Sequence, residues 1–124
     1  MLIFGGTLNG NFGPVLDDLL IAKYDRINHL LTVRPAREEA DSAEERPGAR
    51  RGHSFTAASA PAFESARLAA CAVVLGGWGD GEVEMVPHLV TKGSDDAFAW
   101  RALEVSGSPP ESGTTCAAHF GFDA

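Results

Sequence analysis

Apolar positions along the chain gather in short runs, separated by Gly, Pro, Asn and Asp, without a sustained helical period. Short runs bounded by turn residues are typical of β-strands. The run Leu68 to Leu75 is apolar at both alternating positions, which favours a central strand covered on both faces. We therefore expect an all-β fold with no obligatory helix. The expected strands span residues 1–5, 18–24, 30–34, 53–59, 68–76, 86–92, 98–105 and 116–122.

The strand pattern contains an internal repeat. Residues 2–6 (LIFGG) recur as residues 73–77 (VVLGG), each an apolar run closed by a Gly-Gly pair. Two further apolar segments follow each pair, and then a proline-led turn. In this alignment Leu30 stands where the second copy has Trp100. Internal repetition of this kind is typical of architectures that stack similar elements.

The segment 35–51 differs from the rest of the chain. It contains five acidic and four basic residues and no large apolar one. Such composition is typical of a solvated face. We expect a charged, mobile insertion with one or two exposed helical turns.

Composition narrows the class of protein. The formal net charge is −7, which disfavours binding to nucleic acid. No run approaches the length of a membrane span, and the start of the sequence lacks the basic region of a signal peptide. Cys71 and Cys116 do not make a disulfide framework. These features favour an intracellular location and no membrane partner.

The ordered motifs resemble the kelch repeat, the blade unit of kelch-type β-propellers related to the central domain of galactose oxidase. Each copy has a strand ending in Gly-Gly, and a turn with Arg-Gly-His follows the first copy. Arg50 or Arg51 matches the arginine of that turn, while the spacing of about 70 residues exceeds the kelch period of about 50. The matching positions are Gly5, Gly6, Tyr24, Asp25, Arg51, Gly52, His53, Gly76, Gly77, Trp78 and Trp100.

The resemblance implies antiparallel four-stranded blades of an incomplete propeller. Residues 1–34 would form a partial blade, 35–52 a charged loop, 53–105 a complete blade, and 106–124 a turn with the first strand of another. Closed propellers need about four to eight blades. We therefore expect a fragment, a truncated product, or a subunit that completes its ring by assembly.

A kelch-like chain of this kind implies a non-catalytic scaffold for protein–protein interaction, with no cofactor and no metal. Loops 7–17, 35–51 and 79–87 are the expected contact regions for another protein. The remainder of a propeller, or self-association, would cover the open blade faces. The resemblance assigns a structural role to the motif residues, including His53. It implies that Tyr24 and Trp100 fill the space between adjacent blades.

Alternative interpretations remain open. A galactose-oxidase-like or other kelch-propeller enzyme fragment is one, although the single tyrosine, Tyr24, occupies a structural position of the repeat. A small β-sandwich of unknown function is another. His53, His119, Cys71 and Cys116 supply zinc-ligand chemistry without its usual spacing. The alternating acids in residues 79–84 suggest an acidic turn rather than a calcium loop, because position 91 is Thr.

Overall fold

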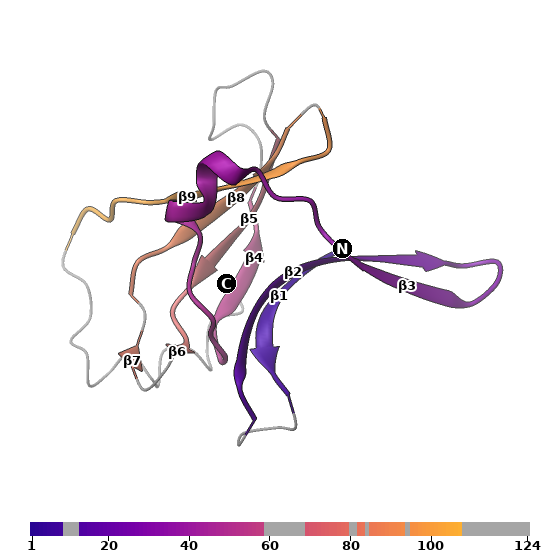
Figure 1. Cartoon of the computed structure of the whole chain (residues 1–124), viewed down its shortest axis with the longest axis horizontal. Coiled ribbons are helices and arrows are strands. Elements are labelled where there is room, and N and C mark those ends of the chain that lie inside the picture. The colour runs from indigo at the N-terminus through magenta and orange to yellow at the C-terminus, as the bar shows by residue number, and fades with distance from the viewer. Residues whose placement is uncertain (9–12, 59–68, 80–81, 84, 94, 108–124) are drawn as a thin grey trace.

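A computed structural model describes residues 1–8, 13–58, 69–79, 82–83, 85–93 and 95–107 of the chain (Figure 1). Within these residues the protein is built from antiparallel β-sheets with almost no helix, so the expected all-β class is confirmed. No helix in the described part is long and apolar enough to cross a membrane.

Sheet A has three strands in chain order: β1 (Leu2–Thr7), β2 (Val15–Asp25) and β3 (Leu30–Pro35). Each corresponds to one of the first three expected strands. The strand β2 begins earlier than expected, because the β1–β2 pairing continues past a bulge between Phe4 and Gly6. A bulge of this kind increases strand twist locally, and β2 curves strongly in Figure 1.

Sheet B has four strands: β4 (Ser54–Ala57), β5 (Ala69–Leu75), β8 (His88–Lys92) and β9 (Phe98–Ala102). Neighbouring strands are antiparallel and follow the chain order β4-β5-β8-β9. A two-stranded hairpin, β6 (Trp78–Gly79) with β7 (Glu82–Val83), lies between β5 and β8 in the chain, where the acidic turn was expected; its two short strands were not among those expected. The strand expected at 116–122 lies outside the described residues.

The hydrophobic core lies between the two sheets. Phe4 packs edge-on against Trp100, with ring centroids 5.2 Å apart. Burial of a large apolar side chain contributes roughly 1.5–3 kcal/mol, so this cluster fixes one face of sheet A against one face of sheet B. We call these the inner faces. The buried cluster comprises Phe4, Leu19, Ala72, Val74, Val90, Phe98 and Trp100.

The charged segment packs on sheet B instead of projecting into solvent as a free insertion. Glu39 N–H donates to the carbonyl of Phe98, and Phe98 N–H donates to that of Arg37, both at 2.8 Å. These bonds cover the free edge of β9, where unpaired backbone groups would otherwise be exposed. The expected helical turns are present as a 3₁₀ helix, η2 (Ala40–Glu45). The expectation of a solvated segment is wrong for Ser42, Pro47 and Arg50, which are buried.

Candidate functional site

The two Gly-Gly pairs have matching backbone conformations. Gly5 and Gly6 have φ of +67° and +107°, and Gly76 and Gly77 have φ of +70° and +96°. Residues with a Cβ adopt positive φ only with strain. The repeat seen in the sequence is therefore also a repeat of backbone geometry, and glycine is required at these positions.

A single turn packs against both glycine pairs. A Cβ on Gly5 would lie 2.8 Å from the carbonyl oxygen of Arg50, and a Cβ on Gly77 would lie 2.8 Å from that of Arg51. Distances below 3.0 Å are not tolerated without displacement of the neighbouring atoms. The absence of side chains at these glycines thus lets the arginine turn approach both sheets.

Arg50 anchors this turn. Its side chain is fully buried, with Nη1 donating to the carbonyl of Gly76 and Nε to that of Gly48, both at 3.1 Å. Its own carbonyl accepts a bond from Gly6 N–H at 2.9 Å. Arg51 instead pairs through its backbone with Trp78, in two bonds of 2.9 and 2.8 Å. The sequence left open which arginine serves the turn, and the structure gives each a distinct part.

His53 lies at the same junction. Its ring packs edge-on against Phe4, with centroids 5.5 Å apart. A Cβ on Gly5 would lie 3.0 Å from His53 Cε1, and a Cβ on Gly77 would lie 2.8 Å from His53 Cβ. Gly52, just before it, has φ of +65°. In this position the imidazole packs between the sheets.

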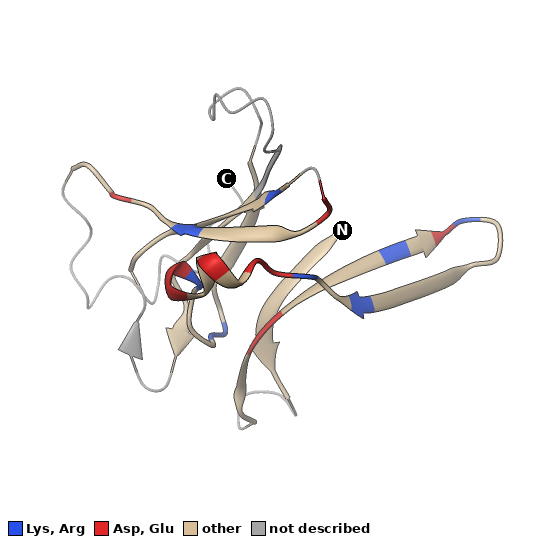
Figure 2. Cartoon of the chain, turned by 45° about the horizontal axis from the view of Figure 1, so that its top comes forward, with Lys and Arg blue, Asp and Glu red and all other residues tan. Residues whose placement is uncertain are grey.

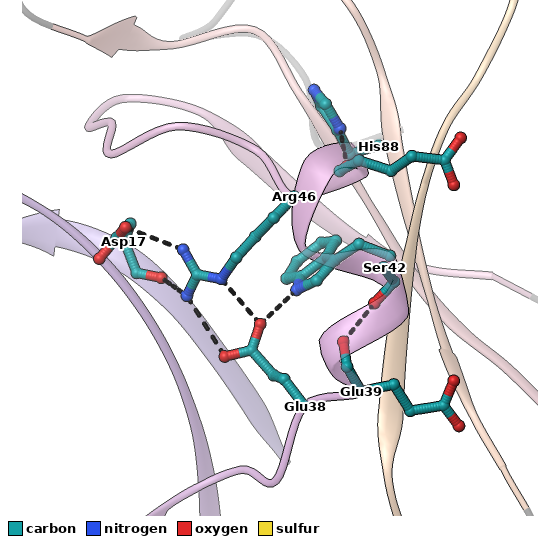
Figure 3. A network of polar contacts seen from close by, with 8 residues as sticks. Asp17, Glu38, Glu39, Ser42, Arg46 and His88 are labelled. Atoms are coloured by element: carbon teal, nitrogen blue, oxygen red, sulfur yellow. Dashed lines mark hydrogen bonds and ion pairs between the residues drawn. The ribbon is translucent and has the colours of Figure 1, made fainter.

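A polar network joins the charged segment to both sheets (Figure 3). Arg46 pairs through Nη1 with the Asp17 carboxylate of β2, and through Nε with Glu38, both at 2.8 Å. Arg46 Nη2 also donates to the backbone carbonyl of Asp17. Trp100 Nε1 of β9 donates to Glu38 Oε1 at 2.6 Å. One carboxylate therefore accepts bonds from the segment's own arginine and from the core tryptophan.

The charge balance around Arg46 favours its ionised form. Burial alone would lower the pKa of this guanidinium, but hydrogen bonding and charge from Glu38, with a further contribution from Asp17, together raise the pKa above its ordinary value. The Arg46 guanidinium carbon also lies 6.0 Å from the centroid of the Phe4 ring. Charged hydrogen bonds of this type are stronger than neutral ones, so Arg46 links sheet A to the segment firmly.

Sequence reasoning missed Asp17, Glu38 and Arg46. The charged composition of residues 35–51 indicated solvent exposure, and nothing local marks Glu38 as a partner of Trp100, which lies 62 residues away. The spacing of Glu38 and Arg46 also exceeds the three or four residues at which helical ion pairs are expected.

Tyr24 and Asp25 lie at the far end of β2, away from the junction. The Tyr24 side chain is 56% exposed, and its hydroxyl is 3.1 Å from His29 Nδ1. Asp25 accepts bonds from the Asn28 side-chain amide and from the backbone N–H groups of Ile27 and Asn28. Those bonds, the Asn28 side chain foremost, lower the pKa of the Asp25 carboxyl. The two residues thus organise the β2–β3 hairpin.

The face of sheet A that points away from sheet B carries apolar side chains. We call it the outer face. Cross-strand partners share a face, and the register pairs Ile3 with Leu20, Ala22 with Val33, and Tyr24 with Leu31. Leu31 is 55% exposed and Val33 48%. Figures 1 and 2 show the β2–β3 hairpin extending away from sheet B. The outer face comprises Ile3, Leu20, Ala22, Tyr24, Leu31 and Val33.

Register shows what this outer face corresponds to in sheet B. With the glycine pairs aligned, Ile3 matches Val74, Ala22 matches Val90, and their partners Val33 and Trp100 match in turn. Val33, and not Leu30 as the sequence alignment indicated, occupies the tryptophan position. The sequence alignment misplaced this position because the loops between strands differ in length in the two repeats. The outer face of sheet A is therefore the counterpart of the buried inner face of sheet B.

Among the described residues, no three His, Cys, Asp or Glu side chains gather as they would around a metal ion. His119, Cys116 and the side chains of Cys71 and of the acidic residues 80–84 lie outside the description. Comparison of the chain with protein-family profiles, with curated proteins and with solved structures finds no match.

Proposed function

We propose that this chain is a non-catalytic protein-interaction scaffold of the kelch-propeller type, in which two repeats stack and a further protein unit covers the outer face of sheet A. The observation that carries the proposal is that the outer face of sheet A corresponds by register to the buried inner face of sheet B. Sheet B buries Val74, Val90 and Trp100 against sheet A. At the matching positions of sheet A, Val33 is 48% exposed and Ile3 is partly exposed, and only the small Ala22 is buried.

The outer face is suited to protein contact. Repeat proteins bury their apolar faces by stacking one unit on the next, and contiguous exposed apolar side chains mark interaction surfaces. The three bulky residues Tyr24, Leu31 and Val33 lie together on two paired strands, each about half exposed. For the isolated chain, the available partner is a second copy.

The acidic surface of η2 gives a second, polar surface beside this scaffold. Glu39, Asp41, Glu44 and Glu45 are exposed, and the helix stands out in red in Figure 2. Glu38 and Arg46 anchor the segment through their ion pair and through the hydrogen bond from Trp100. The exposed carboxylates therefore lie on an anchored helix. Loops held by a rigid framework carry recognition in many folds.

The test is a sedimentation-velocity series over a wide range of protein concentration. We expect the wild-type chain to form a discrete oligomer of about two to four copies, since closed propellers have about four to eight blades. The variant Val33→Glu should dissociate it. Thr32→Glu on the other face of the same strand is the matched control and should leave the oligomer intact. A folded wild-type chain that stays monomeric throughout would overturn the proposal.

A further inference from the structure

The inner faces of the two sheets separate at one end and leave an open cleft of about 540 Å³. Sheet A contributes Leu2, Ile21 and Arg34, and sheet B contributes Phe55, Lys92 and Phe98. Leu2, Ile21 and Phe55 pack against the core yet are only partly buried. This volume falls within the range of about 300–1,000 Å³ typical of small-molecule sites.

Two basic side chains, Arg34 and Lys92, line the cleft together with its apolar residues. Arg34 is the cross-strand partner of Ile21, and Lys92 is the partner of Phe98, so each cation lies beside a large apolar residue of the same cleft. Among the residues that the structure describes, no acidic side chain lines the cleft. The local balance differs from that of the whole chain, which has 17 acidic and 10 basic residues.

The two basic side chains, Lys92 and Arg34, would bind a carboxylate in different ways. Lys92 Nζ lies 3.1 Å from Asp96, a pair whose side chains are 46% and 81% exposed. Exposed pairs of this kind contribute little, so a carboxylate from a ligand can compete with Asp96. Arg34 presents a planar guanidinium, whose geometry matches a carboxylate in a two-bond contact.

We propose that this cleft binds a small amphipathic carboxylate: a molecule with one carboxylate and an unbranched apolar chain. The chain lies on Leu2, Ile21, Phe55 and Phe98, and the carboxylate lies between Arg34 and Lys92. The cleft is on the inner side of sheet A, so the site does not depend on the outer face or on the scaffold function.

The experiment titrates the full chain with decanoate below its micellar concentration, followed by calorimetry and by NMR shifts. We expect one site per chain. Arg34→Gln combined with Lys92→Gln should weaken binding about tenfold or more, since hydrogen bonds to charged groups contribute at least about that factor. Arg101→Gln is the matched control, because Arg101 has the position in β9 that Arg34 has in β3 and lies outside the cleft. It should bind decanoate as the wild type does.

Two further measurements test the shape of the cleft and the contribution of the ligand's charge. Ala57→Phe fills the cleft from an exposed position of β4 and should abolish binding while leaving both cations in place. Decanol, with the same chain and no charge, should bind at least about tenfold more weakly than decanoate. Equal binding of decanol and decanoate, or unchanged binding by the folded Ala57→Phe variant, would overturn the site.

Discussion

At the scale of single residues, two glycines of the repeated pairs differ in the reason why a side chain is disfavoured. Gly77 combines positive φ with backbone contacts that exclude a Cβ, whereas Gly6 has positive φ and no atom near the position of a Cβ. The pair separates two physical causes that are usually mixed: strain of the backbone, and steric exclusion by a neighbouring segment.

Gly77→Ala should therefore destabilise the protein more than Gly6→Ala. Backbone strain alone costs about 1–3 kcal/mol, and we expect Gly6→Ala to fall in that range. Gly77→Ala adds the displacement of Arg51 and His53, for a total of about 3 kcal/mol or more. Urea unfolding of the two variants measures the difference. Equal losses would show that the close approach of the arginine turn is unimportant.

At the scale of elements, the β2–β3 hairpin shows how one side chain can close a turn. The Asp25 carboxylate accepts bonds from two backbone N–H groups and one side-chain amide. His29 ends the turn with φ of +52°, a conformation uncommon outside glycine. The turn precedes β3, which carries Leu31 and Val33 to the outer face.

This turn should loosen in acid. The pKa of Asp25 is below its ordinary value of 3.8, so the charged carboxylate stabilises the folded hairpin. That stabilisation is complete above pH about 4 and is lost as pH falls through the lowered pKa. NMR titration of the Asn28 side-chain amide should give a midpoint below 3.8. Asp25→Asn should remove the transition, and Asp18→Asn should leave it; a midpoint at or above the ordinary value would contradict the role assigned to Asp25.

At the scale of the whole molecule, two arginines of the charged segment offer a comparison. Arg46 is 21% exposed and connects β2 to the segment, whereas Arg37 is 66% exposed and pairs with an exposed Asp95. Removal of one partner from a partly buried charged network leaves other charges with less compensation. Exposed pairs lack this penalty and are screened by salt.

Arg46→Gln should therefore lower the free energy of unfolding by about 1–3 kcal/mol, and Arg37→Gln by about 0–1 kcal/mol. The loss at Arg46 should persist in 1 M salt, since a partly buried pair is weakly screened. Thermal unfolding at low and high salt gives both values. Similar small losses for the two variants would mean that the network does not hold the sheets together.

Much of the strand order could be predicted from the sequence, because alternation, turn residues and glycine pairs act locally. The positions of β1, β5, β8 and β9 follow from short apolar runs, and the all-β class follows with them. The special backbone geometry of the Gly-Gly pairs could also be predicted, since glycine repeated at the end of an apolar strand indicates such geometry. The kelch-like assembly and its partners remain predictions.

Contacts between distant segments required the tertiary structure. Residues 35–51 have the composition of a solvated loop, yet Glu38 meets Trp100 and Arg46 meets Asp17 because the backbone pairs with the edge of β9. Composition reports average exposure and carries no information on which backbone edge lies nearby. The match of Val33 with Trp100 likewise follows from strand register, and not from spacing in the chain.

The sequence by itself determined the strands, their turns and the repeated glycine pairs, because these depend on local backbone preference and on alternation of apolar side chains. The tertiary structure alone decided that Arg50 is buried beside the glycine pairs, that Tyr24, Leu31 and Val33 are about half exposed, and that Arg34 and Lys92 line the same cleft. The reason is physical: local preference fixes each strand, but only packing between sheets decides which faces and which charges meet.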